Sequence, residues 1–398
     1  MHYTKLIIIC ILVLFLPLCS TYKAVVIAPV VDLFGEPLGT VDARTISVCG
    51  GKLNPFIACK RSHQLLFHEL VDVLEEADQW LRIAIPTVYY LVNNTPCNIY
   101  WAEKKYFVPI ETIRKHNTLP TPYNTKASDQ STIVTLTEPH YDKKRNFFFS
   151  VGTRFIAAKP HQKRKKITVW ALNPHKKTIQ TMVLPAHKCY CAKQKTVDDK
   201  INDFVAMVRR WAHLPTGYIP YVWGGCSFIY PAHSNRIEEE YSTNGNPCSL
   251  YRINDYNPPI KTGFDCASLI ARAAQICNIP YFFKNTTTLA ARMNEIKKGD
   301  ALRNGDLLWV SWHVMIVSDI DNNLLVEARG YNHGYGKVHE IPLNKVFKNI
   351  NTYQELMDHI HAKKPLIRLN KNGDEMETYR TAKLLSMRSV FKQSSTLS

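Results

Sequence analysis

The apolar pattern of the chain changes near Val197, and this change limits the folds that the sequence can adopt. From Tyr22 to about Lys195, short alternating or apolar runs are separated by turn residues, a pattern typical of β structure. Residues 198–212 then have the spacing of an amphipathic helix, and the segments 305–317 and 324–328 that come later have the pattern of antiparallel strands. Helices followed by a sheet predict an α+β domain in the C-terminal half.

Six segments before this boundary are candidate strands, four in a first small barrel and two in the core of a second. They are residues 25–32, 64–74, 80–85 and 106–110, and then 147–158 and 167–172. Neither half shows a catalytic constellation of side chains. Two barrels that only package the N-terminus are an alternative to modules that bind or restrict a substrate.

Cys266 stands at the start of a predicted helix. Apolar residues recur at three-and-four spacing over 267–277, which predicts a helix with one buried face, and Asp265 is the expected N-cap. A cysteine in a first turn lies beside unpaired N–H groups and the positive end of the helix dipole, which lowers a thiol pKa. The sequence therefore marks Cys266 as a candidate nucleophile, and a packed structural cysteine such as Cys277 is the alternative.

His313 and Glu327 are the candidate partners of Cys266. With a turn over residues 319–323, residues whose numbers sum to about 640 face each other, so His313 is expected directly opposite Glu327. A carboxylate at that position holds an imidazole in its useful tautomer. A thiol, a histidine and an acid in one domain predict a thiol hydrolase. A hydrogen-bonded strand histidine and a solvated glutamate are the alternative reading.

The N-terminus and the charge bear on location and partners. Residues 1–21 have the positive end, short apolar run and small polar exit of a secretory signal peptide, which predicts an exported protein in the periplasm, cell envelope or medium. A retained anchor is the alternative, although the run is shorter than the ~20 residues that a span needs. The net charge of +17 favours anionic partners, but no nucleic-acid-binding signature accompanies it.

The cysteines predict no metal site. The chain has 11 cysteines, and without Cys266 and the two in the signal segment an even number remains, which is compatible with disulfides after export. Cys189 and Cys191 are separated by a single residue, which is not the spacing of a zinc pair. We expect no metal or organic cofactor.

Four motifs in the C-terminal half resemble those of the NlpC-type (NlpC/P60) cysteine peptidases, which cleave bacterial cell-wall peptides. The resemblance is strong over about residues 198–343, and the two N-terminal segments are similar to bacterial SH3-type domains, as in the γ-D-glutamyl-L-diamino acid endopeptidases. The motifs are Pro220-Tyr-Val-Trp-Gly-Gly225, Gly263-Phe-Asp-Cys266, Gly305-Asp-Leu307 and His313-Val-Met-Ile-Val317.

The resemblance implies a papain-like NlpC-type catalytic domain preceded by two small SH3-like β-barrels. The implied divisions are a signal peptide (1–21), barrel 1 (22–115), barrel 2 (116–195), the peptidase domain (196–365) and a basic, partly disordered tail (366–398). The implied partner is peptidoglycan or its stem peptides, with no stable membrane insertion after signal removal.

The resemblance also assigns roles to individual residues. Cys266 is the expected nucleophile, His313 the base and Glu327 the third polar residue. Tyr221 is expected beside the nucleophile, and Asp265 and Glu69 are expected to hold a free substrate amine.

Three departures from the family pattern bear on substrate scope. Ala267-Ser268 replaces the usual Ser-Gly, and Glu327 stands where His is commoner. A long insertion over residues 226–262 contains Cys226 and Cys248, which are expected to staple a flap beside the site. Amidase or acyltransferase chemistry on another substrate, and a wall-binding protein without activity, are the alternative functions.

Overall fold

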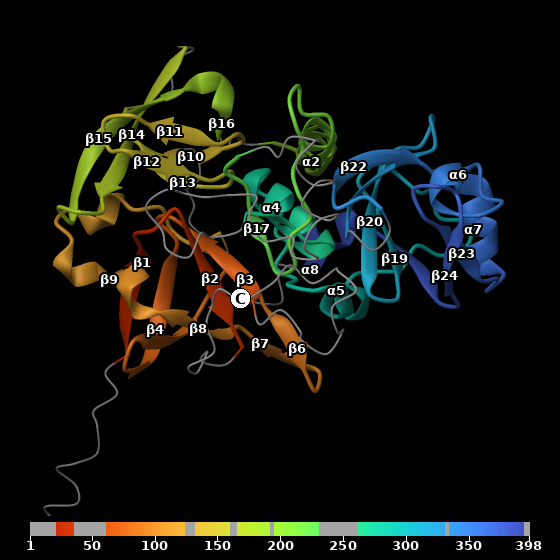
Figure 1. Ribbon diagram of the computed structural model, residues 1–398, viewed down its shortest axis with the longest axis horizontal. Helices are drawn as coiled ribbons and strands as arrows, with labels where there is room; N and C mark the ends of the chain where they lie inside the picture. Colours follow the sequence, from red (N-terminus) through yellow and green to blue (C-terminus); the bar gives the residue numbers. More distant parts are fainter. Residues whose placement is uncertain are drawn as a thin grey trace, which may run out of the picture.

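The chain folds into two β units and one mixed unit (Figure 1). The computed structural model describes residues 21–35, 61–123, 132–159, 165–191, 195–230, 262–330 and 334–393. The signal segment and most of the insertion after Cys226 lie outside these residues. No helix among the described residues is long and apolar enough to cross a membrane.

The first unit is a seven-stranded sheet in the order β3-β2-β8-β5-β4-β1-β9, with a separate hairpin, β6-β7. Its inward side chains form one apolar core that includes Leu33, Leu81, Ile83 and Tyr100. The elements are β1 (Tyr22–Val26), β2 (Val30–Phe34), β3 (Arg61–Leu66), β4 (Leu70–Ala77), β5 (Trp80–Ala84), β6 (Tyr90–Val92), β7 (Thr95–Cys97), β8 (Ile99–Glu103), η2 (Lys104–Tyr106), β9 (Phe107–Pro109), η3 (Ile110–Thr112) and η4 (His116–Thr118).

The second unit is a five-stranded antiparallel sheet in the order β15-β14-β13-β10-β16, beside the hairpin β11-β12. The aromatic side chains of Phe147, Phe149 and Phe155 pack in its core against Phe67 of the first unit. The elements are β10 (Ile133–Leu136), β11 (His140–Asp142), β12 (Phe147–Phe149), β13 (Arg154–Ala157), β14 (Lys166–Asn173), β15 (Thr178–Pro185), η6 (Ala186–Lys188) and β16 (Cys189–Cys191).

The third unit contains helices followed by a five-stranded sheet in the order β22-β21-β20-β19-β25. This mixed architecture confirms the helix-then-sheet prediction. The elements are α2 (Val197–Ala212), β17 (Cys226–Ser227), β18 (Gly263–Phe264), α4 (Cys266–Ile276), α5 (Thr286–Arg292), β19 (Leu307–Val310), β20 (His313–Asp319), β21 (Leu324–Arg329), β22 (Lys337–Pro342), α6 (Leu343–Val346), α7 (Tyr353–His361), β23 (Leu366–Leu369), β24 (Glu375–Tyr379), β25 (Ala382–Leu385), η8 (Met387–Ser389) and α8 (Val390–Gln393).

Three of the expected strands are each divided into two. Residues 25–32, 64–74 and 147–158 contain the ends of separate strands joined by tight turns. In the second case His68 has φ of 74°, in the left-handed region, so β3 ends at Leu66 and β4 begins at Leu70. The apolar residues continue through these turns, so the sequence pattern does not indicate them. Glu69 lies in the turn between β3 and β4 and not within a strand.

The expected SH3-like barrels are not confirmed. In the described part of the first unit, the edge strands β3 and β9 are not paired with each other, so its sheet does not close. The second sheet likewise has β15 and β16 at opposite edges. In their described parts both units are open antiparallel sheets.

The expected basic, partly disordered tail is wrong for residues 366–393. Strand β25 pairs with β19 at the edge of the five-stranded sheet, and β23 pairs with β24. Leu366, Leu384 and Leu385 are at most 1% exposed, so the third unit extends beyond residue 365. The few apolar residues of this segment suffice because it adds one strand to an existing sheet and buries them there.

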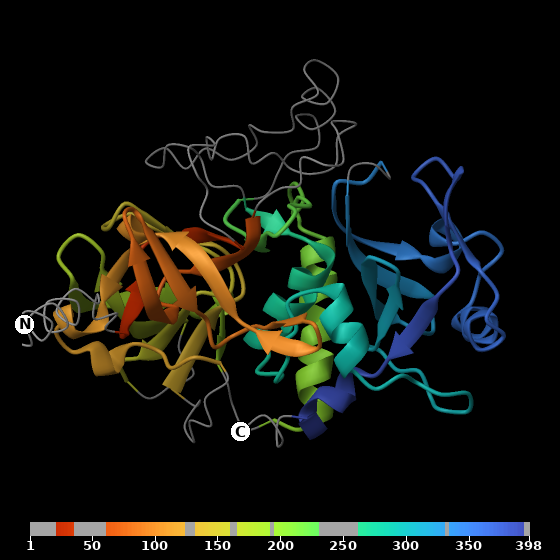
Figure 2. The same ribbon diagram turned by 90° about the horizontal axis from the view of Figure 1, so that it is seen from below.

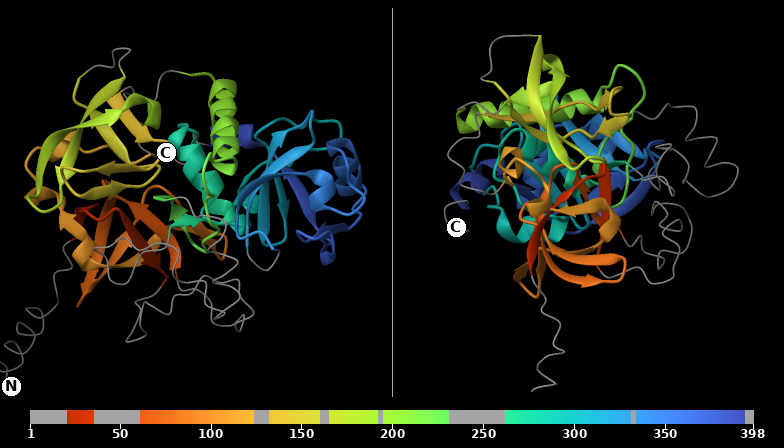
Figure 3. Two further views of the ribbon diagram at one scale, coloured as in Figure 1. Left: turned by 45° about the horizontal axis from the view of Figure 1, so that its top comes forward. Right: turned by 90° about the vertical axis from the view of Figure 1, so that its left-hand side faces the viewer.

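Helix α4 is buried along its whole length, although its sequence pattern predicts a single apolar face. All 11 residues are buried. One side faces the five-stranded sheet, and Arg272 and Gln275 on the other face the first unit. Figures 2 and 3 show α2 and α4 between the two N-terminal units and this sheet.

Hydrogen bonds across the units fix the position of the site. Gln64 Oε1 accepts from the Cys226 N–H at 2.9 Å and from the Ser227 hydroxyl at 2.6 Å. The Tyr89 N–H donates to the Phe282 carbonyl at 2.8 Å. The first unit is therefore attached to segments on both sides of α4.

Candidate active site

Cys266 is the first residue of α4, and the residues around it form a capping box. Asp265 Oδ1 accepts from the Ser268 N–H at 2.7 Å, and Ser268 Oγ accepts from the Asp265 N–H at 3.1 Å. Asp265 is thus the N-cap that the sequence predicts. Ser268, at a position that departs from the family pattern, fixes the start of the helix and is 1% exposed. The Cys266 thiol consequently has a defined place at the helix N-terminus.

The thiol of Cys266 is not acidified, contrary to the expectation from its position. Burial raises its pKa to about 12, and the nearby Asp265 carboxylate acts in the same direction. Hydrogen bonds from the N–H groups of Val314 and Ala267 and the charge of Arg329 favour the thiolate but are outweighed. The helix terminus does supply hydrogen-bond donors to the thiolate. Cys266 is only 9% exposed, however, and its desolvation destabilises the thiolate more than these donors stabilise it.

The hairpin β19-β20 places His313 beside Cys266. Val310 pairs with His313, so Ser311 and Trp312 form a two-residue turn, and the predicted continuous strand over 305–317 is broken there. Trp312 is 84% exposed with φ of 68°. The Val314 N–H is hydrogen-bonded to the Cys266 sulfur, so the start of β20, where His313 stands, lies close to the thiol.

His313 and Glu327 are in contact, although the register differs from the prediction. His313 Nε2 is 2.7 Å from Glu327 Oε2. The observed pairs Ile316–Val326 and Val317–Leu325 sum to 642, so the two residues are diagonal neighbours and not direct opposites. A shift of two residues keeps both side chains on the same face, whereas a shift of one would separate them.

Glu327 has two further partners that the sequence did not indicate. His339, opposite it on β22, places Nε2 3.1 Å from Glu327 Oε1. The guanidinium of Arg368 donates to both carboxylate oxygens, at 3.2 and 2.5 Å. The side chains of Arg368 and Glu327 are 0% exposed. The alternating pattern of residues 337–342 is a weak indication of a strand that carries His339. Arg368 lies in the segment 366–398, which the sequence predicts to be a tail, so no role was expected for it.

These partners keep Glu327 ionised. Burial alone would raise its pKa, but the charge of Arg368 and the hydrogen bonds from His313 and His339 hold it well below its usual range. An ionised carboxylate only accepts hydrogen bonds, so His313 Nε2 carries the proton in this contact. His313 Nδ1 is therefore the nitrogen left to receive a proton from the thiol.

His313 is neutral near neutral pH. Burial lowers its pKa to about 4, the charge of Arg329 adds to this effect, and Glu327 acts in the opposite direction. The resting state is consequently a neutral thiol beside a neutral imidazole. A proton moves to His313 only when the sulfur attacks, and Glu327 then stabilises the imidazolium.

Tyr221 lies close to the start of α4. It forms a β-bridge with Phe264, two residues before Cys266, and a Cβ at Gly330, just after β21, would lie 3.6 Å from its ring. A Cβ at Gly263 would lie 2.3 Å from the Pro220 carbonyl oxygen, so glycine is required for this close approach. The two glycine-containing motifs therefore pack against each other beside the thiol.

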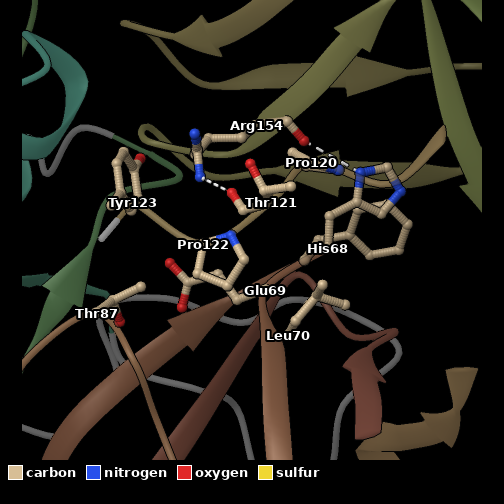
Figure 4. A pocket seen from close by; sticks show the side chains of 10 residues that line it. His68, Glu69, Leu70, Thr87, Pro120, Thr121, Pro122, Tyr123 and Arg154 are labelled. Carbon is tan, nitrogen blue, oxygen red and sulfur yellow. Dashed lines mark hydrogen bonds between the residues drawn. The ribbon is translucent and has the colours of Figure 1, made fainter. Parts of the chain in front are cut away.

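Glu69 belongs to a different environment from Asp265. Its Oε1 accepts from Arg272 Nη1 at 2.9 Å. It lines a pocket where the two N-terminal units meet, together with Thr87, Tyr123 and Arg154 (Figure 4). Neither Asp265 nor Cys266 lines this pocket. Arg272 is therefore a cation from the chain itself that pairs with Glu69.

The expected disulfides are not found among the described cysteines. No disulfide joins two of the described cysteines, which are Cys97, Cys189, Cys191, Cys226, Cys266 and Cys277. Cys226 is buried, and its expected partner Cys248 lies outside the described residues. The described residues also contain no group of three or more potential metal ligands.

The neutral thiol leads to a prediction about alkylation. A thiol with a pKa of about 12 reacts through a small thiolate fraction, so the rate at Cys266 should rise about tenfold per pH unit between about pH 6 and 9. Iodoacetamide labelling followed by mass spectrometry of the peptide containing Cys266 measures this rate. A rate independent of pH in this range would instead indicate a preformed thiolate–imidazolium pair.

Comparisons with known proteins give matches in structure only. No model of a protein family and no curated protein matches the sequence. An NlpC/P60 family protein from Bacillus cereus ATCC 10987 has 16% identity and a TM-score of 0.50, over 81% of this chain and 94% of that chain. NlpC2 from Trichomonas vaginalis has 10% identity and a TM-score of 0.32, over 82% and 94% of the two chains. The peptidoglycan hydrolase RipB from Mycobacterium tuberculosis has 21% identity and a TM-score of 0.22, over 37% and 62%.

The first of these matches covers most of both chains. Identity of 16% supports a statement about the fold, and the four sequence motifs point to the same family. The chain therefore has the fold of an NlpC/P60-family protein.

Proposed function

We propose that the chain is a cysteine peptidase that cleaves the amide bond between γ-linked D-glutamate and a diamino acid in peptidoglycan stem peptides. The observation that carries this proposal is the linked arrangement around Cys266. The N–H next to His313 bonds to the thiol sulfur, and His313 Nε2 lies 2.7 Å from Glu327 Oε2. The orienting acid thus contacts the base, and the strand start that carries the base lies close to the nucleophile.

The reaction follows from these contacts. As the Cys266 sulfur attacks the carbonyl carbon, His313 takes the thiol proton and then gives it to the leaving amine. A thioester remains, and water attacks it after losing a proton to His313, which restores the thiol and releases the acid. Arg368 and His339 keep Glu327 in position for both steps.

The choice of bond and location rests on the sequence motifs. The four motifs resemble those of peptidases of cell-wall peptides, and residues 1–21 have the pattern of a signal peptide. We therefore place the protein outside the cytoplasm, with the N-terminal units as SH3-like modules that restrict access to a papain-like domain. The net charge of +17 suits an anionic wall.

Product analysis tests the proposed reaction. Purified protein is incubated with the tripeptide L-Ala-γ-D-Glu-diamino acid and with its α-linked isomer, each in free and N-acetylated form. We expect the diamino acid to be released from the γ-linked peptides only, as read by mass spectrometry. Equal cleavage of both isomers would contradict the proposed specificity, and transfer to an added amine without hydrolysis would favour an acyltransferase.

A further inference from the structure

The carboxylate of Asp265, beside the nucleophile, already has partners from the chain itself. Oδ1 is occupied by the N–H and hydroxyl of Ser268, both at 2.7 Å. Oδ2 accepts from the Gly224 N–H at 3.1 Å, and Lys284 Nζ lies 3.9 Å from the same oxygen. The negative charge of Asp265 is thus balanced by a lysine before any substrate arrives.

Lys284 is held in this position by the first unit. Its N–H donates to the Tyr89 carbonyl at 2.9 Å, and its side chain is only 10% exposed. Its charge also contributes to the lowered pKa of His63, after the effect of burial, so the ammonium lies close to this buried ring. At 3.9 Å it is too far from Asp265 to donate a hydrogen bond, and its ammonium has no hydrogen-bond partner among the described residues.

The hydroxyl of Tyr281 is a second available donor. Tyr281 is 0% exposed, and its hydroxyl oxygen has no hydrogen-bond partner in the described part of the chain. Burial first, and then the charges of Cys266 and Asp265, raise its pKa well above its usual range. Tyr281 belongs to the same apolar core as Cys266, and a buried donor without a partner favours an acceptor supplied by a ligand.

The second carboxylate expected to meet a substrate amine is also balanced internally. Glu69 is paired with Arg272, whose side chain is 1% exposed. Each of the two carboxylates therefore has a resident cation, although Glu69 Oε2 has no hydrogen-bond partner in the described part of the chain and Glu69 lines a pocket that Asp265 does not line. Near Asp265 a free substrate ammonium would be repelled by Lys284, whereas a neutral amide carbonyl would accept a hydrogen bond from that lysine.

We propose that Lys284, together with Tyr281, selects substrates whose amino end is amide-linked over substrates that carry a free ammonium there. This inference rests on the proposed function and reverses the preference expected from Asp265 and Glu69. The carbonyl oxygen of the amide accepts from the Lys284 ammonium and the Tyr281 hydroxyl. Stem peptides still attached to the wall through their amino end belong to this substrate class, and released peptides do not.

Binding to an inactive protein tests this proposal separately from the reaction. The full chain with Cys266→Ala is titrated by calorimetry with the γ-linked tripeptide in free and N-acetylated form. We expect the acetylated peptide to bind about tenfold more tightly, the effect of a charge-assisted hydrogen bond combined with the loss of a like-charge contact. Adding Lys284→Met should reduce this ratio by about tenfold, because Asp265 then lacks its cation.

Matched variants distinguish the role of the charge from that of the fold. Lys284→Arg keeps the cation and should keep the preference, whereas Tyr281→Phe should weaken binding of the acetylated peptide alone. If Lys284→Met does not fold, as judged by circular dichroism, Lys284→Gln takes its place.

The outcomes separate the two proposals. Tighter binding of the free peptide, an unchanged ratio in the Lys284 variant, or no binding of either peptide would each overturn the inference. Tight binding of the acetylated peptide without its cleavage by the parent protein would leave the inference standing and reject the proposed reaction.

Discussion

Replacing Cys266 by alanine is expected to lower hydrolysis of the γ-linked peptide by a factor of at least about 10⁴, and His313→Ala by a similar factor. Both side chains act in the bond-making and bond-breaking steps. Cys266 cannot take over the role of His313, and His313 cannot take over that of Cys266. Initial rates measured by mass spectrometry or chromatography give the comparison.

Cys277→Ala is the matched control for Cys266→Ala. Cys277 is a free, fully buried thiol just beyond the other end of α4, and no proposed step involves it. Its replacement removes one buried sulfur, so it should cost about 1 kcal/mol of stability and leave the rate per folded molecule unchanged. Full turnover by the Cys266 or His313 variant would reject the mechanism.

Replacing Arg368 by methionine is expected to destabilise the folded protein by about 3–5 kcal/mol, because Glu327 then becomes a buried charge without its cation. The free energy of unfolding from urea titration measures this loss. The double variant Arg368→Met/Glu327→Leu should be more stable than Arg368→Met alone, since no uncompensated charge remains.

The exposed ion pair between Lys348 and Glu375 is the control for this experiment. Its side chains are 45% and 53% exposed, so Lys348→Met should change the free energy of unfolding by no more than about 1 kcal/mol. A loss from Arg368→Met as small as that of the control would show that Glu327 does not depend on Arg368.

The sequence determined the local features around Cys266. Apolar spacing and the Asp265 cap predicted α4, because helix caps and periodicity are properties of neighbouring residues. The contact between His313 and Glu327 was also predictable, although the register was wrong by two residues. Strand alternation fixes only the parity of the register, so it does not distinguish a direct pair from a diagonal one.

The tertiary structure alone decided the charge state and the partners of the site. Arg368 reaches Glu327 from a segment 41 residues away, and Lys284 and Arg272 neutralise Asp265 and Glu69. The pKa of Cys266 also depends on burial by the packed units, which outweighs the helix terminus that the sequence shows. Desolvation and long-range ion pairs depend on which segments pack together, and no local pattern of residues encodes them.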